Sequence, residues 1–155
     1  MRSADGESTT RKSILILDDD FDIVTVIKQG LQKHSSFDIY AFTDPALALE
    51  HFEVNVRRYQ LVISDIRMPK MNGFEFIKKI KQIKPEVKVF CMTAFEINDI
   101  EFRRVLPSMR IDEFIQKPIS LDRLNTLVRT HVMNEKRAIT KKNTIESKIN
   151  TAITN

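Results

Sequence analysis

Ser-Ile-Leu-Ile-Leu-Asp-Asp-Asp (13–20) joins a short apolar run to three consecutive acids. An apolar run of this length, without polar alternation, is typical of a strand that is covered on both faces. Acids directly after such a strand place carboxylates at its C-terminal end, where open parallel sheets bind ligands. This stretch therefore predicts a buried parallel sheet with an acidic site at one edge.

Three further strand-like runs also end at a residue with useful chemistry. They are 60–64 before Asp65, 87–92 before Thr93 and 113–116 before Lys117. A fifth run, 37–42, completes the set. The C-terminal ends of parallel strands share one edge of a sheet. We therefore expect the acids after 13–17, the carboxylate of Asp65, the hydroxyl of Thr93 and the amine of Lys117 to converge there.

Helical patterns separate these runs. The expected features are a stripe of Ile23, Ile27 and Leu31 with Val24; a helix from Asp44-Pro45 through Phe52; a helix after Asn72-Gly73 with Phe74, Ile77 and Ile80; a short polar helix at 97–106; and a last helix capped by Ser120, with Leu121, Leu124, Leu127 and Val128 facing inward. Five alternating strand–helix units predict an α/β fold, a doubly wound parallel sheet with helices on both faces.

Composition places the chain among globular proteins of one domain. It has 155 residues, 42% of them hydrophobic and 30% charged, and no apolar run approaches the about 20 residues of a membrane span. The N-terminus is polar and lacks the apolar core of a signal peptide. The single Cys91 lies inside a strand run, which favours a buried, inert thiol in a reducing compartment.

The excess charge lies in the two ends of the chain. Residues 1–12 hold three basic and two acidic side chains, residues 133–155 hold five and two, and the net charge is +4, which leaves residues 13–132 neutral. We expect 1–12 to be a flexible segment, 13–132 to be the folded domain, and 133–155 to be a basic tail with no output domain. For the tail we expect a frayed or disordered segment first, and second a helix that docks on a partner or extends the last helix.

The predicted edge suits phosphoryl chemistry. A carboxylate can accept a phosphoryl group, provided that a cation neutralises the two negative charges. Magnesium prefers oxygen ligands and needs few of them from the protein. A lysine and a hydroxyl can bind phosphate oxygens. Each residue type alone is commonplace at a strand end, but their occurrence at successive ends favours a function.

These motifs resemble the receiver domain of two-component response regulators. The resemblance rests on the acids after Ile-Leu-Ile-Leu, on Asp-Ile-Arg-Met-Pro-Lys-Met-Asn-Gly (65–73), on Met-Thr-Ala (92–94) and on Lys-Pro (117–118), and it covers about residues 12–132. It implies the flavodoxin-like (βα)5 fold with strand order 2-1-3-4-5.

The resemblance also implies roles around the phosphoryl group. Asp65 matches the phosphoacceptor. Asp19 matches the magnesium-binding acid and Asp18 its neighbour, which acts partly through water, while the backbone carbonyl of Arg67 and the Asp65 carboxylate complete a site for Mg²⁺, with Mn²⁺ as an alternative. Asp20 receives no direct role.

Four further residues match switching and tuning positions of the family. Thr93 matches the switch hydroxyl, Lys117 the lysine that pairs with the phosphate, and Phe114 the aromatic switch residue. Arg67 and Phe95 lie where the family tunes hydrolysis of the phosphorylated state. Pro118 matches a proline that follows a cis bond.

As a whole, the resemblance implies a cytoplasmic signalling switch and a regulatory domain, not an enzyme beyond self-catalysed phosphotransfer and autodephosphorylation. A sensor histidine kinase supplies the phosphoryl group, and a downstream protein or a second receiver reads the face formed by the fourth helix, the last strand and the last helix. We expect no membrane partner. One departure stands out, because Arg110-Ile111 replaces the usual Gly-Ala before the last strand.

Other interpretations stay open. The chain can be a fragment of a longer regulator, and its basic tail can bind nucleic acid, which the neutral core is not expected to do. A haloacid-dehalogenase-type phosphatase would need Asp-x-Asp-x-Thr, and Asp18-Asp19-Asp20-Phe21-Asp22 lacks the hydroxyl. His34, His51 and His131 lack metal-ligand spacing and are interpreted as surface or helix-end residues.

Overall fold

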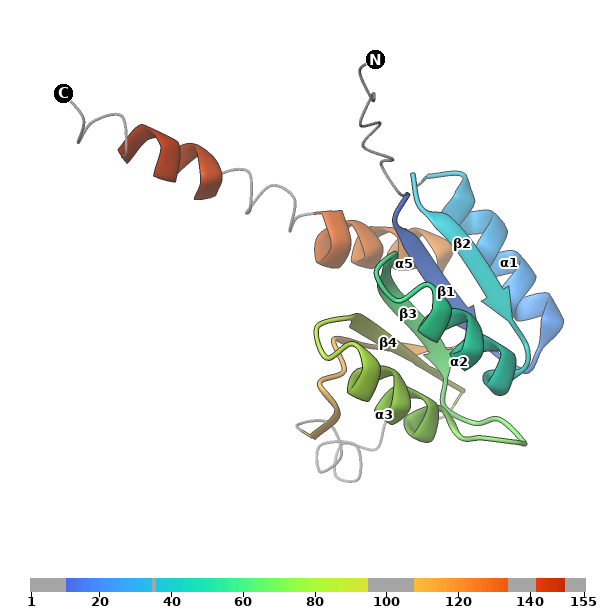
Figure 1. The fold of residues 1–155 in the computed structure, drawn as a ribbon. Coiled ribbons are helices and arrows are strands. Elements are labelled where there is room, and N and C mark those ends of the chain that lie inside the picture. The colour runs from blue at the N-terminus through green and yellow to red at the C-terminus, as the bar shows by residue number, and fades with distance from the viewer. Residues whose placement is uncertain (1–10, 35, 95–107, 134–141, 150–155) are drawn as a thin grey trace, which may run out of the picture. The chain divides into compact units, whose positions relative to one another are not determined.

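The computed structural model describes residues 11–34, 36–94, 108–133 and 142–149. The chain divides into two units, Met1–Pro118 and Ile119–Asn155, each considered by itself. The elements of the first unit are β1 (Ser13–Leu17), α1 (Phe21–Gln32), β2 (Asp38–Phe42), α2 (Pro45–Val54), β3 (Tyr59–Asp65), α3 (Gly73–Ile83), β4 (Lys88–Thr93) and β5 (Glu113–Gln116) (Figure 1).

The strands form one sheet in the order β2-β1-β3-β4-β5, and all of its pairings are parallel. This is the predicted flavodoxin-like arrangement. The chain order reverses between β1 and β3, which is the position where such sheets open a crevice at their C-terminal edge. The register aligns Leu17 with Ser64, so the residues that follow, Asp18 and Asp65, leave neighbouring strands at the same level.

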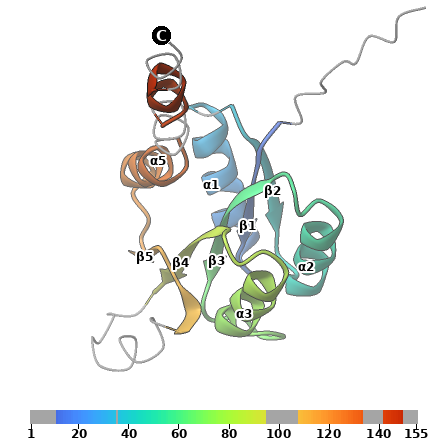
Figure 2. The ribbon, with the colours of Figure 1, turned by 60° about the vertical axis from the view of Figure 1, so that its left-hand side comes forward.

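Helices cover both faces of this sheet. Helix α1 lies on one face, and α2 and α3 lie together on the other (Figure 2). Helix α1 buries Val24, Ile27 and Leu31. The core under α2 and α3 combines Ala48, Phe52, Phe76, Ile77 and Ile80 with inward side chains of the strands. Strands β1, β3 and β4 are almost entirely buried, as their unbroken apolar runs indicated, whereas the outer strands β2 and β5 are mostly half-buried.

The predicted strands agree with the observed ones to within one residue at each end. The small differences matter, because Asp65 and Thr93 are the last residues of β3 and β4 and therefore have the fixed backbone of a ladder. The predicted pattern of α3 is confirmed at Ile77 and Ile80, which are buried, and Phe74 is half-buried against the core. The pattern omitted Phe76, which is buried and has helical spacing to Ile80.

Short polar side chains begin the helices. Asp44 accepts hydrogen bonds from the first backbone N–H groups of α2, as predicted, and Asn72 accepts one from the N–H of Glu75 at the start of α3. Asp20, which received no role from the sequence, caps α1 by accepting from the N–H groups of Asp22 and Ile23. The third acid of the opening motif therefore has a structural function.

The second unit contains α5 (Leu121–Val128) and a π-helix, η1 (Arg129–Met133), that directly follows it. Ser120 caps α5 as predicted. Leu124 and Val128 are buried, while Leu121 and Leu127 are half-buried. No helix among the described residues is both long and apolar enough for a bilayer crossing.

Residues 142–149 of the tail form a further helix, with Ile145 and Ile149 exposed. The expectation of a frayed or disordered segment is therefore wrong over this stretch. Its weak helix propensity hid the element, although the spacing of the isoleucines had suggested it as the second interpretation. The polar helix expected at 97–106 lies outside the described residues.

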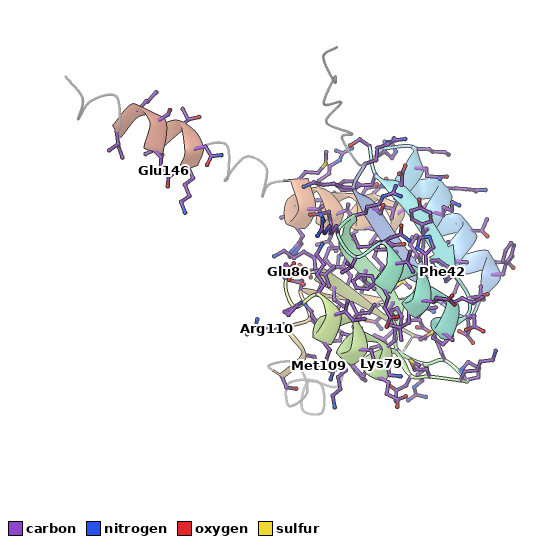
Figure 3. The ribbon with its side chains drawn as sticks, viewed as in Figure 1. Phe42, Lys79, Glu86, Met109, Arg110 and Glu146 are labelled. Carbon is purple, nitrogen blue, oxygen red and sulfur yellow. The ribbon has the colours of Figure 1, made fainter. Side chains whose placement is uncertain are left out.

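Arg110 has a left-handed backbone, with φ of 49°. Its neighbours Met109 and Ile111 pack against the core, whereas the Arg110 side chain is exposed (Figure 3). The chain must turn sharply to bury both neighbours, and this turn uses a conformation that glycine adopts with less strain. The departure noted in the sequence, arginine in place of glycine, thus falls on the one described non-glycine residue with positive φ.

We predict that Arg110→Gly stabilises the protein by up to about 1 kcal/mol, because it removes the strain of a Cβ atom in the left-handed region. Urea unfolding followed by circular dichroism measures the change. Arg110→Ala is the control, since it removes the charge but keeps Cβ, and it should give no gain. Equal stabilisation by the two variants would show that charge, not backbone strain, is responsible.

His51 lies in the last turn of α2, and its ring turns toward the sheet. Its Nδ1 is 2.6 Å from the hydroxyl of the fully buried Tyr59, and the rings of Tyr40 and Phe42 are 4.5 and 5.3 Å away between centroids. The Tyr59 hydroxyl needs an acceptor in this buried place, which a neutral His51 provides. Burial, and secondly the charge of Arg58, lower the pKa of His51 below its ordinary 6.5.

We predict that stability falls as the pH drops below about 6.5, because the unfolded chain then binds a proton at His51 that the folded chain resists. The contribution is fully present above that pH and is lost toward the lower folded pKa. The free energy of unfolding is measured from about pH 8 to about pH 5, the range in which histidine titrates. As the pH is lowered, it should fall less steeply for His51→Gln than for the wild type. An unchanged slope would contradict the assignment.

Candidate functional site

Three carboxylates converge at the C-terminal edge of the sheet. Asp18 and Asp19 follow β1, Asp65 ends β3, and one oxygen of each lies within 4.8 Å of the others. Asp18 and Asp65 are buried, and Asp19 is exposed. One Asp18 oxygen also accepts a hydrogen bond of 2.9 Å from the backbone N–H of Asp20, which fixes its orientation. The parallel register of β1 and β3 thus brings together the acids that the sequence predicted.

Lys117 reaches this cluster from the end of β5. Its Nζ lies 2.7 Å from an Asp18 oxygen and 3.3 Å from an Asp65 oxygen. The backbone N–H of Lys117 donates to the carbonyl of Thr93 at 2.7 Å, so the start of the side chain is tied to the end of β4. One lysine therefore pairs with acids from two strands that are not neighbours of its own.

The charges of the cluster perturb one another. Burial, and then repulsion from Asp18, raise the pKa of Asp65, and burial raises the pKa of Asp18 despite its bond to Lys117. For Lys117, burial lowers the pKa, but the hydrogen bond and charge of Asp18 and the charge of Asp65 outweigh it, so its pKa is raised. Lys117 therefore stays protonated, whereas ionising Asp18 and Asp65 together costs free energy.

The loop after Asp65 forms one wall of an open pocket of about 510 Å³. The pocket is lined by Asp19, Ile66, Arg67, Met68, Pro69, Asn72 and Phe74. The loop is anchored at both ends, because the N–H of Ile66 donates to the carbonyl of Met92 and the N–H of Gly73 donates to the carbonyl of Ile66. Lys70 adds a surface ion pair of 3.0 Å with Asp44. Asp19 is the member of the acid cluster that lines this pocket.

Gly73 allows α3 to begin directly against the phosphoacceptor candidate. A Cβ atom at this position would lie 2.0 Å from the carbonyl oxygen of Asp65 and 2.7 Å from Cα of Ile66. Both are backbone atoms of the sheet and of its first loop residue, so they cannot move aside as a side chain would. A side chain at position 73 is therefore excluded by space and not by backbone torsion.

The structure brings together Asp18, Asp19, Asp65 and Lys117 from the predicted set. Thr93 is buried at the end of β4, and Phe114 is half-buried on β5, where it pairs in register with Cys91. Arg67 is exposed beside the pocket. The peptide bond between Lys117 and Pro118 is cis, as expected. Phe95 lies outside the described residues.

Sequence reasoning missed two features of this site. It paired Lys117 only with a phosphate oxygen and did not predict the ion pair between Lys117 and Asp18 that the structure contains. It also treated Gly73 only as part of a motif, and the contact with Asp65 depends on a distance that no local pattern contains. The cap formed by Asp20 was detectable, because an acid shortly before the first residue of a helical stripe, here Ile23, is a common N-cap.

Comparison with known proteins gives the family. The response regulator receiver domain matches residues 14–129, most of the chain. The chain belongs to this family of two-component systems. The receiver domain is a regulatory domain, and its match spans every strand of the sheet.

Curated relatives share the receiver sequence but are longer. The chain is 31% identical over 119 residues to the alkaline phosphatase synthesis transcriptional regulatory protein PhoP of Bacillus subtilis, covering 76% of the chain and 47% of the relative. It is 34% identical over 111 residues to the transcriptional regulatory protein ZraR of Klebsiella oxytoca, covering 72% and 24%. The chain thus spans half or less of the length of these relatives.

Solved structures agree on the fold. A response regulator receiver domain protein from Clostridium thermocellum superimposes with a TM-score of 0.71 at 24% identity, covering 82% of this chain and 98% of that one. The BeF3-activated DrrB receiver domain gives a TM-score of 0.66 at 23% identity, covering 79% and 98%. These similarities establish the flavodoxin-like architecture.

We predict that Gly73→Ala destabilises the protein by about 1–3 kcal/mol, because the start of α3 or the end of β3 must shift to admit one methyl group. Urea unfolding measures the loss. Lys78→Ala, on the exposed side of the same helix, is the matched control and should change stability by less than about 0.5 kcal/mol. A tolerated Gly73→Ala would mean that the helix start is free to move.

Proposed function

We propose that this receiver accepts a phosphoryl group on Asp65 from the phosphohistidine of a sensor histidine kinase. The observation that carries the proposal is the convergence of Asp18, Asp19 and Asp65 with Lys117 at the C-terminal edge of the sheet. This set supplies an oxygen nucleophile, oxygen ligands for a cation and one fixed positive charge. Asp19 and Ile66, the residue directly after Asp65, line the open pocket, and we place the incoming phosphoryl donor there.

The residues present fit a divalent cation. Three carboxylates against one ammonium group leave the cluster with excess negative charge, and all three offer the hard oxygen ligands that Mg²⁺ and Mn²⁺ prefer. We assign the ligands to Asp19, Asp65, the Arg67 backbone carbonyl and, partly through water, Asp18. When bound, the cation screens the negative charges of the carboxylate and the phosphoryl group from each other.

The transfer itself is a displacement at phosphorus. An Asp65 carboxylate oxygen forms a bond to phosphorus while the phosphorus–nitrogen bond of the phosphohistidine breaks, and the electron pair leaves with the imidazole. Lys117 holds a phosphoryl oxygen by its charge, and Thr93 donates a hydrogen bond to another. Hydrolysis, which we assign Arg67 and Phe95 to tune, returns the carboxylate.

Phosphorylation then changes which groups Lys117 and Thr93 bind. Lys117 now holds carboxylates of two strands, and a phosphoryl group on Asp65 adds stronger acceptors to the same place. Because Lys117 is bonded through its backbone to Thr93, both residues and Phe114 on the same strand respond together. The result is a bias between two conformations, which a downstream protein or a second receiver reads.

We place this switch in the cytoplasm and give the domain no catalytic role beyond its own phosphorylation and dephosphorylation. Transcriptional regulators are prominent among the relatives, and a cyclic di-GMP phosphodiesterase of Thermotoga maritima is also similar. These outputs differ, although the receiver sequence is shared. The proposal therefore concerns the input reaction, which the described residues carry.

We predict that acetyl phosphate phosphorylates the chain only with magnesium present, and that Asp65→Asn abolishes the reaction, because the amide cannot form the acyl phosphate. Intact-mass spectrometry detects the added phosphoryl group, and its loss in mild base identifies an acyl phosphate. Beryllofluoride should bind the wild type and not the variant. Equal incorporation into Asp65→Asn would contradict the proposal.

The metal assignment has a matched pair of variants in adjacent residues. Asp19→Asn should lose magnesium affinity, measured by titration calorimetry, because a ligand charge is removed. Asp20→Asn should keep it, since asparagine caps α1 as well as aspartate does. Equal loss in both variants would place the metal elsewhere.

A further inference from the structure

Helices α2 and α3 lie side by side on one face of the sheet and carry opposite charge (Figures 1 and 2). Helix α2, Pro-Ala-Leu-Ala-Leu-Glu-His-Phe-Glu-Val, has two glutamates and no lysine or arginine. Helix α3, Gly-Phe-Glu-Phe-Ile-Lys-Lys-Ile-Lys-Gln-Ile, has three lysines and one glutamate. The outer surface of this layer is therefore acidic over one helix and basic over the next.

The charged groups at the centre of this surface have no partners within the described part of the chain. Glu50 and Glu53 on α2 and Lys78 and Lys79 on α3 are all exposed, and none of the four forms an ion pair or hydrogen bond with a described residue through its side chain (Figure 3 labels Lys79). By contrast, Lys70 beside them is paired with Asp44. Four unpaired charges of segregated sign are available to another molecule.

Apolar side chains accompany these charges. Leu47 and Val54 on α2 are 58% and 81% exposed, and Ile83 at the end of α3 is 36% exposed. Burying large apolar side chains this exposed is favourable, but their exposure does not identify the molecule that covers them. The charge pattern indicates a second copy of this chain, because the charges of α2 are complementary to those of α3.

Symmetry limits how two copies can use this surface. Both helices connect parallel strands, so they run in the same direction. A twofold axis perpendicular to them, in the plane of the layer, would set α2 on α2 and α3 on α3, with like charges opposed. A twofold axis along the helices sets α2 of each copy on α3 of the other, so that opposite charges meet twice.

We propose that the outer faces of α2 and α3 form a self-complementary surface that joins two copies of this chain. Glu50 and Glu53 of one copy face Lys78 and Lys79 of the other, and the exposed Leu47 and Val54 are covered in the same contact. The pairing needs no phosphoryl group and lies on residues outside the acid cluster, so it is independent of the proposed function. Exposed ion pairs contribute little each, so the dimer is weak and salt-sensitive.

Sedimentation equilibrium of the unphosphorylated full chain tests the proposal. At low salt the average mass should rise from 18.1 kDa toward twice that value as the concentration approaches about 0.5 mM, the range of weak interfaces. Glu50→Lys with Glu53→Lys, and separately Lys78→Glu with Lys79→Glu, should each weaken dimerisation by more than about tenfold, because like charges then oppose each other twice. Lys28→Glu on α1 with Lys33→Glu directly after it reverses two lysines away from the α2–α3 layer and should have no effect beyond that of net charge.

The decisive sample is an equimolar mixture of the two reversed variants. Each is repelled by itself, but together they restore opposite charges at both contacts, so a heterodimer should form, and a chain carrying all four substitutions should again dimerise with itself. A wild type that stays monomeric, or a mixture that does not associate, would overturn the proposal. If a reversed variant fails to fold by circular dichroism, disulfide formation between Glu50→Cys and Lys78→Cys chains decides the same point, and no cross-link would reject it.

Discussion

The Lys117 ammonium group binds the carboxylates of Asp18 and Asp65 at the same time, and the functional edge of the molecule depends on this interaction. Two buried acids this close repel each other, and burial already disfavours their ionised forms. A cation between them reduces that cost. The fold supplies this cation, Lys117, from the end of β5, two strands away from β3. Strands β1, β3, β4 and β5 must therefore be in place before the repulsion between the two acids is reduced.

The geometry of the backbone imposes a second constraint on the same site. Gly73 brings the first turn of α3 against the carbonyl of Asp65, and the cap of Asn72 fixes where that helix begins. The segment between them is consequently held at both ends while its side chains line the pocket. The charges of Asp18, Asp65 and Lys117 therefore lie on a backbone frame with little freedom.

Local patterns predicted a large part of this arrangement. Unbroken apolar runs such as 13–17 gave the strands, and polar caps such as Asp44 gave the helix starts, because both depend on neighbours in sequence. The pattern for α3 was incomplete, because it named Phe74, Ile77 and Ile80 and omitted Phe76. Both phenylalanines contact the core, and only packing decides that Phe76 is the fully buried one. His51 is a helix-end residue, as predicted, but the hydrogen bond between its ring and the buried hydroxyl of Tyr59 was not predicted, because it depends on a contact with another strand.

The sequence by itself determined the order of elements, the chemistry at each strand end and the family, because these follow from short-range composition and motif spacing. Tertiary structure alone decided that Lys117 bonds to Asp18 as well as to Asp65, and that α2 and α3 present opposite charges on one surface. It also decided the left-handed backbone of Arg110, whose neighbours pack against the core. These features depend on residues that are distant along the chain. Their distances depend on register, twist and packing of the complete sheet, which no stretch of sequence specifies alone.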